Sequence, residues 1–412
     1  MKFEFIDERE RYNAKIKVIG TGGAGGNAIN NMIAAGLKGV DFIAANTDCQ
    51  DLDRSLCSYK IQLGPSVTMG LGAGADPDIG RVSAEESIEE IREAVEGSDM
   101  VFITAGMGGG TGTGASPVIA RVSKEAGALT VAVVTKPFEF EGQKRMKRAI
   151  EGLGRLQKEV DSLIVIPNER LKTLGSKSTT FKDLISRADD VLLQAVQGIS
   201  DLIMSSGFIN LDFADVKKVM EQMGTAIMGM GTATGENRAA EAAQMAINSP
   251  LLEDISIDGA KGVLLNITGP SDMTMDEVNE ASSYIKKEVS DEAEIFWGVV
   301  FNDDLKDEIR VTVIATGLSS NGDAYKKSYV GDYSNVVELG KVRDLDPEDT
   351  LEDWTVRMNG QSLDVPTFQR KGSGLSSVVS EEAAEERKRG ILSKFRLRDN
   401  LDYPTFLRAK AD

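Results

Sequence analysis

The sequence predicts an α/β protein with a parallel sheet, a long central helix, a second and smaller α+β domain, and a disordered C-terminal tail. Three observations support this prediction. Short β-branched runs alternate with helical stretches up to residue 166, which is typical of a parallel sheet with helices on both faces. A helical repeat then continues through residues 180–206. After Leu318 the apolar pattern is lost, as in segments that cannot build a core.

The predicted strands of the first domain are short apolar runs that end in turn residues. Near-continuous apolar runs of this kind fit strands that are buried on both faces. They cover residues 15–19, 40–45, 100–105, 129–134 and 162–166. Residues 83–96 begin with Ser83 and continue with acidic residues, a pattern that predicts a capped helix. We expect residues 14–179 to form one Rossmann-like domain after an N-terminal tail at 1–13.

Residues 180–206 carry apolar side chains at a 3.6-residue period over about seven turns, and Gly207 ends the pattern. A helix of this length is a natural spacer between two domains. Residues 207–318 then combine a helix near 236–248 with three apolar runs, and predict the smaller α+β domain. The three runs are residues 262–267, 295–301 and 309–316.

The composition excludes several kinds of chemistry. The chain has no histidine, which rules out His-ligated metals, Ser-His-Asp or Cys-His catalysis, and an imidazole pH switch. Cys49 and Cys57 lack metal-ligand spacing, so no zinc site is predicted, and so few cysteines indicate a reducing compartment. The net charge of −18 argues against nucleic acid or an anionic membrane as a partner. No apolar run reaches the length of about 18 residues that membrane insertion needs, and the N-terminus shows no signal peptide.

The first glycine cluster, Gly20, Gly22 and Gly25, reads G-x-G-x-x-G between a predicted strand and a predicted helix. Such a loop brings backbone close to a phosphate at a helix N-terminus. Asp41 follows at the spacing of a ribose-binding acid, so this cluster alone supports an NAD(P)-dependent oxidoreductase. A tight turn without a ligand is the simpler interpretation.

A second glycine cluster, residues 106–114, follows another predicted strand and opens another helix. Its backbone N–H groups and two threonine hydroxyls would form a concavity for an anion. A dehydrogenase does not need two phosphate loops, and the sequence contains no G-x-x-x-x-G-K-[ST] motif. Two such loops at neighbouring strand ends favour a nucleoside triphosphate that is held by backbone groups.

Residues 108–114, GGGTGTG, resemble the signature phosphate loop of the tubulin superfamily, and residues 14–318 resemble the FtsZ family of bacterial cell-division GTPases. The resemblance implies a tubulin/FtsZ-like GTPase domain that binds GTP or GDP with Mg²⁺. We predict no direct side-chain ligand of the metal. The resemblance also implies a cytoplasmic protein at the mid-cell division site.

The resemblance assigns nucleotide-binding residues through five motifs in the order in which the family has them. They are GTGGAGGNA at 20–28, AANTD at 44–48, the phosphate loop, the ribose-side KPFEFEGQKR at 136–145, and a base-side set. The expected contacts are Gly22, Gly23, Ala24, Gly25, Gly26, Asn27, Asn46, Thr47, Asp48, Gly108, Gly109, Gly110, Thr111, Gly112, Thr113, Gly114, Glu141, Arg145, Asn168 and Asp189. One position departs: Ile185 stands where the family often has an aromatic platform for the base, one turn before Asp189.

The segment NLDFAD resembles the family's synergy loop, which makes Asn210, Asp212 and Asp215 the expected catalytic residues. Two carboxylates three residues apart would repel each other if buried, so they are expected to face water or a cation. A carboxylate there orients an attacking water or places a cation. An N-terminal cap for a helix at 215–223 is the alternative interpretation.

The family scheme implies that a head-to-tail partner supplies these carboxylates to the GTP of the next copy. Because such a contact does not close on itself, it produces filaments, and the family builds a ring-like scaffold from them at the division site. Arg145 could offset γ-phosphate charge. A scaffold that polymerises without hydrolysis is the remaining alternative.

The tail contains a repeat: LDVPTFQR at 363–370 lies within a segment, 319–389, that we expect to be a disordered linker, and LDYPTFLR at 401–408 lies beyond it. An apolar motif repeated in a solvated tail favours a docking peptide over chance similarity. The terminal segment, 390–412, resembles the family's adaptor-binding peptide for a membrane-tethering partner of FtsA type. The expected contacts are Asp402, Tyr403, Pro404, Phe406, Leu407 and Arg408.

Overall fold

The computed structural model describes five stretches of the chain: residues 14–173, 179–204, 212–221, 224–252 and 257–317. Several expectations fall outside these stretches and stay predictions. They concern the N-terminal tail at 1–13, Asn210, the linker at 319–389 and the docking peptide at 390–412.

Six parallel strands form the first part of the sheet, in the order β3-β2-β1-β4-β5-β6. Five of them confirm the predicted apolar runs. Their bounds are β1 Ile16–Thr21, β2 Val40–Asn46, β3 Tyr59–Gln62, β4 Met100–Gly106, β5 Leu129–Lys136 and β6 Ser162–Pro167. Because all six run the same way, their carboxyl ends share one edge of the sheet and their amino ends share the other.

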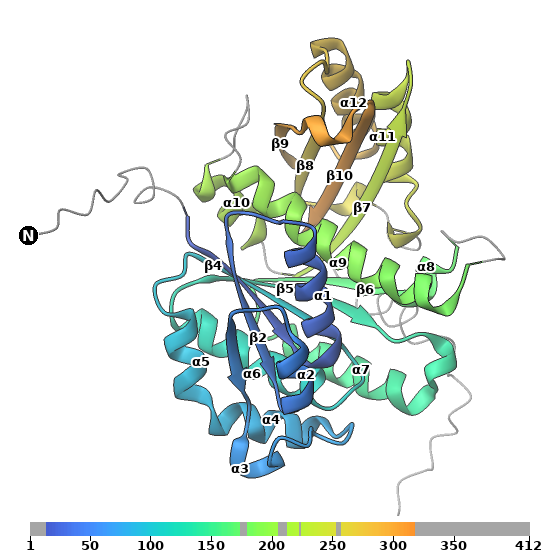
Figure 1. The fold of residues 1–412 in the computed structure, drawn as a ribbon. Coiled ribbons are helices and arrows are strands. Elements are labelled where there is room, and N and C mark those ends of the chain that lie inside the picture. The colour runs from blue at the N-terminus through green and yellow to red at the C-terminus, as the bar shows by residue number, and fades with distance from the viewer. Residues whose placement is uncertain (1–13, 174–178, 205–211, 222–223, 253–256, 318–412) are drawn as a thin grey trace, which may run out of the picture. The chain divides into compact units, whose positions relative to one another are not determined.

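Helices cover both faces of this sheet, as the alternating pattern predicts (Figure 1). Helices α1 and α9 share one apolar core with β1 and β5, and α5, α6 and α7 share a second core on the other face. The bounds are α1 Gly22–Ala34, α2 Cys49–Arg54, α3 Pro65–Thr68, α4 Pro77–Glu86, α5 Ile88–Val95, α6 Thr111–Glu125, the 3₁₀ turn η2 Glu139–Glu141, α7 Gln143–Leu156, α8 Asn168–Leu171 and α9 Phe181–Met204.

The helix predicted over 83–96 is wrong in its start and in its continuity. Helix α4 begins earlier, after Asp76, whose carboxylate accepts a hydrogen bond from the Asp78 N–H at 2.9 Å. The helical run then breaks at Ser87. The Ser87 hydroxyl accepts from the Gly64 N–H at 3.1 Å and donates to the Gln62 carbonyl at 3.3 Å. These bonds to the last residue of β3 and to the loop after it hold Ser87 out of a continuous helix.

The second block continues the same ten-stranded sheet. Strand β7 pairs with β6 in parallel over three residues, and the order continues β7-β10-β8-β9 with antiparallel β7–β10 and β10–β8 pairs. The bounds are α10 Phe213–Met220, β7 Gly224–Thr234, α11 Arg238–Ile247, η3 Pro250–Leu252, η4 Ile257–Gly259, β8 Gly262–Gly269, α12 Met275–Glu288, β9 Glu294–Phe301, η5 Asp303–Leu305 and β10 Glu308–Thr316. The predicted runs correspond to β8, β9 and β10, whereas β7 and α12 were not predicted.

Glycines in β7 explain how α11 packs on it. A Cβ atom at Gly229 would lie 2.1 Å from the carbonyl oxygen of Ala246, and one at Gly231 would lie 2.1 Å from that of Ala242. Only glycine therefore allows the backbone of α11 to approach this closely.

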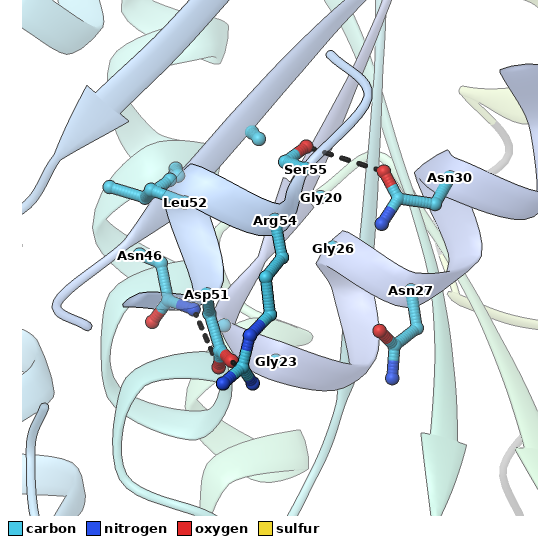
Figure 2. A pocket seen from close by; sticks show the side chains of 13 residues that line it. Gly20, Gly23, Gly26, Asn27, Asn30, Asn46, Asp51, Leu52, Arg54 and Ser55 are labelled. Atoms are coloured by element: carbon cyan, nitrogen blue, oxygen red, sulfur yellow. Dashed lines mark hydrogen bonds and ion pairs between the residues drawn. The ribbon is translucent and has the colours of Figure 1, made fainter. Parts of the chain in front are cut away.

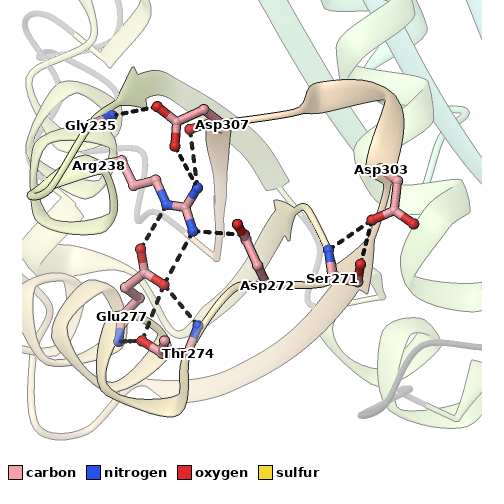
Figure 3. Close-up of polar contacts among 8 residues, drawn as sticks. All are labelled: Gly235, Arg238, Ser271, Asp272, Thr274, Glu277, Asp303 and Asp307. Atoms are coloured by element: carbon pink, nitrogen blue, oxygen red, sulfur yellow. Dashed lines mark hydrogen bonds and ion pairs between the residues drawn. The ribbon is translucent and has the colours of Figure 1, made fainter.

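A buried arginine holds three connections of the second block together (Figure 3). The Arg238 side chain is 7% exposed and contacts Asp272 at 3.0 Å, Glu277 at 2.7 Å and Asp307 at 2.9 Å. Its hydrogen bond to Glu277 holds the pKa of that carboxyl below its usual range. The arginine thus ties the start of α11 to the β8–α12 and β9–β10 connections.

Helix α9 confirms the predicted long helix and ends at the amino edge of the first six strands. At its C-terminal end, the Met204 side chain lies 3.1 Å from where a Cβ of Gly39, just before β2, would stand. After α10, Gly224 pairs with Ser162, the first residue of β6. Both neighbours of the 205–223 segment therefore lie at this amino edge. Helix α3 follows β3 and so marks the carboxyl edge. In Figure 1, α3 lies at the bottom of the view, and α10 lies above it, toward the second block.

Candidate functional site

The two glycine clusters meet at the carboxyl edge of β1 and β4. A Cβ at Gly22 would lie 2.9 Å from the backbone nitrogen of Gly112, and one at Gly25 would lie 2.4 Å from the Thr104 carbonyl oxygen. The loops are thus in backbone contact, which side chains at these positions would prevent. Parallel pairing of Gly20 with Thr104 puts the two loops side by side.

Helices α1 and α6 begin at this meeting point, and no side chain in the described part of the chain caps either one. Their first turns also hold no acidic residue. By contrast, Asp48, Asp76 and Thr274 cap α2, α4 and α12. Uncapped N–H groups and the positive ends of two helix dipoles favour an anion at one place.

Threonine hydroxyls add polar groups near the meeting point of the two glycine clusters. The Thr47 and Thr111 hydroxyls, from the β2–α2 loop and α6, are hydrogen-bonded at 2.6 Å. The buried hydroxyls of Thr21 and Thr104 have no hydrogen-bond partner among the described residues. Such orphaned buried groups are uncommon and point to a missing ligand or water.

A cavity of about 220 Å³ lies beside the first glycine loop, between α1 and α2 (Figure 2). Five predicted contact residues line it: Gly22, Gly23, Gly26, Asn27 and Asn46. Asn30, Asp51, Leu52, Arg54 and Ser55 also line it and were not predicted. The Asn46 amide donates to Asp51 at 3.4 Å, and the Ser55 hydroxyl donates to Asn30 at 3.3 Å.

The predicted ribose-side residues lie against the second glycine loop. Arg145 and Glu141 form an ion pair at 2.9 Å, and Glu141 also accepts a hydrogen bond from the Phe138 N–H at 2.9 Å. A Cβ at Gly108 would lie 2.7 Å from the Arg145 carbonyl oxygen. The pair is therefore fixed between the end of β5 and the start of α7.

The predicted base-side residues lie farther along the same edge. Asn168 begins α8 directly after β6; it is buried, and its Oδ1 has no partner in the described part of the chain. Burial, and then the neighbouring Asp190 carboxylate, raise the pKa of Asp189 to about 6. The Asn31 amide of α1 donates to Asp190 at 2.9 Å and holds α9 against α1 at this level. Ile185 is half-buried one turn before Asp189.

A third glycine-rich loop, residues 69–76, packs against the second glycine cluster and was not predicted. Gly110 packs against it so closely that a Cβ there would lie 2.8 Å from the Ala73 Cβ and 3.0 Å from the Asp76 nitrogen. Met69 and Ala75 adopt φ values of 52° and 61°, which non-glycine residues rarely take. Strain of this kind often accompanies function. The alternating glycines in GLGAG were the available sequence signal.

The prediction that Asp41 binds a ribose is wrong. Asp41 pairs with Lys17 near the start of its strand, whereas Gly20 pairs with Ala44. Asp41 therefore lies at the opposite end of the strand from the glycine loops. It lines a separate cavity with Lys17 and Tyr59. This removes the observation that favoured an oxidoreductase.

Asp212 and Asp215 lie away from the glycine loops, at the start of α10. Asp212 occupies the cap position with φ −64° and ψ 142°, but its side chain makes no capping hydrogen bond. The helix expected at 215–223 runs instead from Phe213 to Met220, so Asp215 lies in its first turn, and the capping interpretation holds for the position of Asp212 and not for its carboxylate. Asp212 is exposed and Asp215 is half-buried, so Asp212 is the more accessible of the two.

Two further kinds of feature are absent from the described residues. No group of three or more Cys, Asp or Glu side chains there could hold a metal ion. None of the helices there is long and apolar enough to cross a membrane.

A parallel sheet whose carboxyl edge carries two uncapped helices and three glycine loops defines a nucleotide-binding α/β protein. The sequence pattern of the Tubulin/FtsZ family, GTPase domain, matches residues 15–176, and that of the FtsZ family, C-terminal domain, matches residues 224–319. The chain belongs to the FtsZ family of cell-division GTPases, within the tubulin superfamily.

Similar proteins agree with this assignment. Cell division protein FtsZ from Azotobacter vinelandii is 48% identical over 410 residues, 100% of each chain. The Rickettsia felis protein of the same name is 52% identical over 354 residues, 86% of this chain and 76% of its own. An empty FtsZ dimer from M. jannaschii has a TM-score of 0.73 at 47% identity, covering 76% of this chain and 91% of its own. The GDP-bound CetZ1 monomer from Haloferax volcanii, 19% identical with a TM-score of 0.63 over 78% of this chain and 99% of its own, shares the fold.

Adjacent glycines of the phosphate loop should respond differently to alanine. Gly108 has a φ of 99° and no room for a Cβ, so Gly108→Ala should lower the free energy of unfolding by about 1–3 kcal/mol. A Cβ at Gly109 meets nothing within 4 Å, so Gly109→Ala should keep its stability and lose at least about tenfold in GTP affinity, because the methyl occupies phosphate space. Urea unfolding and fluorescent-GTP titration measure both. Normal GTP affinity of Gly109→Ala would show that phosphate lies elsewhere.

Proposed function

We propose that this chain hydrolyses GTP at a site shared by two copies in head-to-tail contact. GTP binds at the carboxyl edge of the first six strands, on the loops around Gly22, Thr47 and Gly110. The next copy supplies Asp212, assisted by Asp215 and Asn210. Assembly then activates hydrolysis, and GDP at the contact weakens it.

The observation that supports this proposal is the placement of the two halves at opposite edges of one sheet. Strand β1 has 6 residues, so the two edges are about 20 Å apart. The glycine loops follow the carboxyl ends, whereas the elements before and after Asp212 reach the amino ends at Gly39 and Ser162. A carboxylate on the amino edge cannot contact a nucleotide on the carboxyl edge of its own copy. It can contact the nucleotide of a second copy whose carboxyl edge faces this amino edge.

The chemistry required of Asp212 fits its surroundings. The side chain is exposed, makes no capping bond, and has no basic neighbour in sequence before Lys217. An exposed carboxylate of this kind can accept a hydrogen bond from water and orient it toward the γ-phosphate. The uncapped N–H groups of α1 and α6 would stabilise the charge that develops on the phosphate oxygens.

The site fits Mg²⁺ that is bound mainly through the nucleotide. Mg²⁺ commonly keeps several waters and takes phosphate oxygens with one or two protein groups. The Thr47–Thr111 hydroxyl pair lies beside the phosphate loop. The ion would offset phosphate charge there, and these hydroxyls would orient the triphosphate.

At the level of the cell, the proposed filaments form a ring-like scaffold at mid-cell. The chain would divide into a GTP-binding domain at 14–179, the central helix, and a second domain at 207–318. The peptide at 390–412 would dock an adaptor that tethers filaments to the membrane. The inner copy of the repeat at 363–370 would add avidity if it docks as well.

GTP affinity should fall at acidic pH because, in this proposal, the Asp189 carboxylate accepts hydrogen bonds from guanine. The base presents two N–H donors, so its partner must be an ionised carboxylate. With the raised Asp189 pKa of about 6, lowering the pH from 7.5 to 5.5 should protonate the free site and raise the Kd for GTP about fourfold. The variant Asp189→Asn should bind weakly and lack this component. It is a matched control because the triphosphate titrates equally in both. Parallel pH curves would contradict this role.

Mixing two inactive variants tests the shared site. Gly109→Ala has a blocked phosphate loop and an intact Asp212, and Asp212→Asn has the reverse. At a GTP concentration near the wild-type Kd, each alone should hydrolyse GTP at least about tenfold more slowly than wild type, because each contact lacks one half. An equal mixture should recover about a quarter of the wild-type rate per subunit, since a quarter of random head-to-tail contacts join two intact halves.

The control for this experiment is a mixture of Gly109→Ala with the double variant Gly109→Ala/Asp212→Asn. This mixture contains no intact phosphate loop and should stay inactive. An inactive mixture of the two single variants would contradict a shared site. A wild-type rate for Asp212→Asn alone would remove Asp212 from the mechanism.

A further inference from the structure

The cavity that Asp41 lines has a volume of about 380 Å³ and opens beside the C-terminal end of α5, and we call it the amino-edge cavity. Small-molecule sites have volumes of roughly 300–1,000 Å³. Lys17 precedes Thr21, at the carboxyl end of β1, by about 13 Å of strand, so the cavity is separate from the glycine loops. Residues of β1, β2, β3 and α5 line it, among them Lys17, Asp41, Ile43, Tyr59, Glu93 and Ala94.

Strand register brings the lining residues of the sheet to one face. Lys17 pairs with Asp41, and Tyr59 pairs with Ile43, in parallel strands. Lys17, Asp41 and Tyr59 each stand two residues before an isoleucine of the core that α5 covers. These isoleucines are Ile19, Ile43 and Ile61. Because side chains alternate along a strand, all three residues point to the α5 face, whereas Lys60, the residue after Tyr59, points to the other.

The positive charge of Lys17 is engaged at the end of α5. Its ammonium donates to the carbonyl oxygen of Ala94 at 2.7 Å and to that of Glu96 at 3.4 Å. Helix α5 ends at Val95, with Glu96 at the cap position, so these are carbonyls that the helix leaves free at its negative end. The lysine therefore caps α5 and is held against that helix end.

The other lining residues combine an apolar floor with an acidic rim. Ile43 and Ala94 are buried, whereas the Asp41 and Glu93 carboxylates are exposed. The Tyr59 side chain is 46% exposed and presents an aromatic ring at the same opening. Among the lining residues, two carboxylates thus stand against one ammonium that is already bonded to the protein. The cavity favours a ligand that is cationic and partly apolar.

We propose that the amino-edge cavity binds an aliphatic polyamine. The ammonium groups of the ligand pair with Asp41 and Glu93 and lie on the Tyr59 ring, because the face of an aromatic ring attracts cations. The methylene chain between them covers Ile43 and Ala94 and removes apolar surface from water. An inorganic cation gains nothing from this floor, and an anion meets two carboxylates. The proposal is independent of the shared hydrolytic site, since none of these residues belongs to it.

Equilibrium dialysis of labelled spermidine against the full chain, with GDP present, tests the acidic rim. Asp41→Asn and Glu93→Gln each remove one charge at nearly constant shape, and each should raise the Kd for spermidine about threefold. Glu90→Gln is the matched control, because it makes the same charge change at an exposed residue of α5 that does not line the cavity. Its Kd should equal that of the wild type.

The same measurement tests the ring and the floor. Tyr59→Leu removes the aromatic face and should raise the Kd for spermidine about threefold, whereas Tyr59→Phe keeps the face and should keep the Kd. Ammonium chloride should displace spermidine no better than sodium chloride at equal ionic strength, because the ammonium ion has no methylene chain to cover Ile43 and Ala94.

The outcomes separate a built site from general attraction to an acidic surface. Weaker binding in the Asp41, Glu93 and Tyr59→Leu variants, with wild-type binding in Glu90→Gln, supports the cavity as the site. An equal loss of affinity in Glu90→Gln would overturn it, because spermidine would then be held by surface charge alone. Wild-type protein that does not bind spermidine, or lining variants that bind it with the wild-type Kd, would overturn it as well.

Discussion

Two helix N-termini without caps converge at one point, and the remaining features of the site are arranged around that point. Helices α1 and α6 would leave their first N–H groups unsatisfied there unless an anion or water accepted them. The glycines follow from this constraint, because the helices can approach each other only where Gly22 and Gly112 lack side chains. The hydrogen bond between Thr47 and Thr111 and the loop at 69–76 enclose this point. Under the proposed function, a nucleoside triphosphate supplies the charge that this geometry favours.

The parallel sheet adds a second constraint, which is direction. Everything that follows a strand lies at one edge, and α9, with its 24 residues, extends about 36 Å and leads the chain to the other edge. Asp212 therefore follows the nucleotide residues in sequence without approaching them in space. Under the proposed function this separation makes hydrolysis depend on assembly.

Much of the fold could be predicted because buried parallel strands are apolar throughout and α9 repeats at a helical period. Strand β7 escaped prediction since Gly229 and Gly231 serve the packing of α11, which no local pattern reveals. Ser87 breaks a helix through hydrogen bonds to a distant loop. The assignment of Asp41 to a ribose was wrong because spacing in the sequence does not show at which end of a strand a residue lies. The first two glycine loops were predicted from local sequence alone, whereas the packing of the 69–76 loop on Gly110 needed the structure.

The most direct test of the shared site is phosphate release from GTP per subunit, measured with Mg²⁺ across a wide range of protein concentrations. A site divided between copies predicts a rate per subunit near zero at low concentration that rises beyond a threshold, and a threshold that coincides with the onset of sedimentable assemblies. A rate per subunit that is constant at every concentration would show that each copy hydrolyses GTP alone. That result would contradict the assignment of Asp212 to the nucleotide of a second copy.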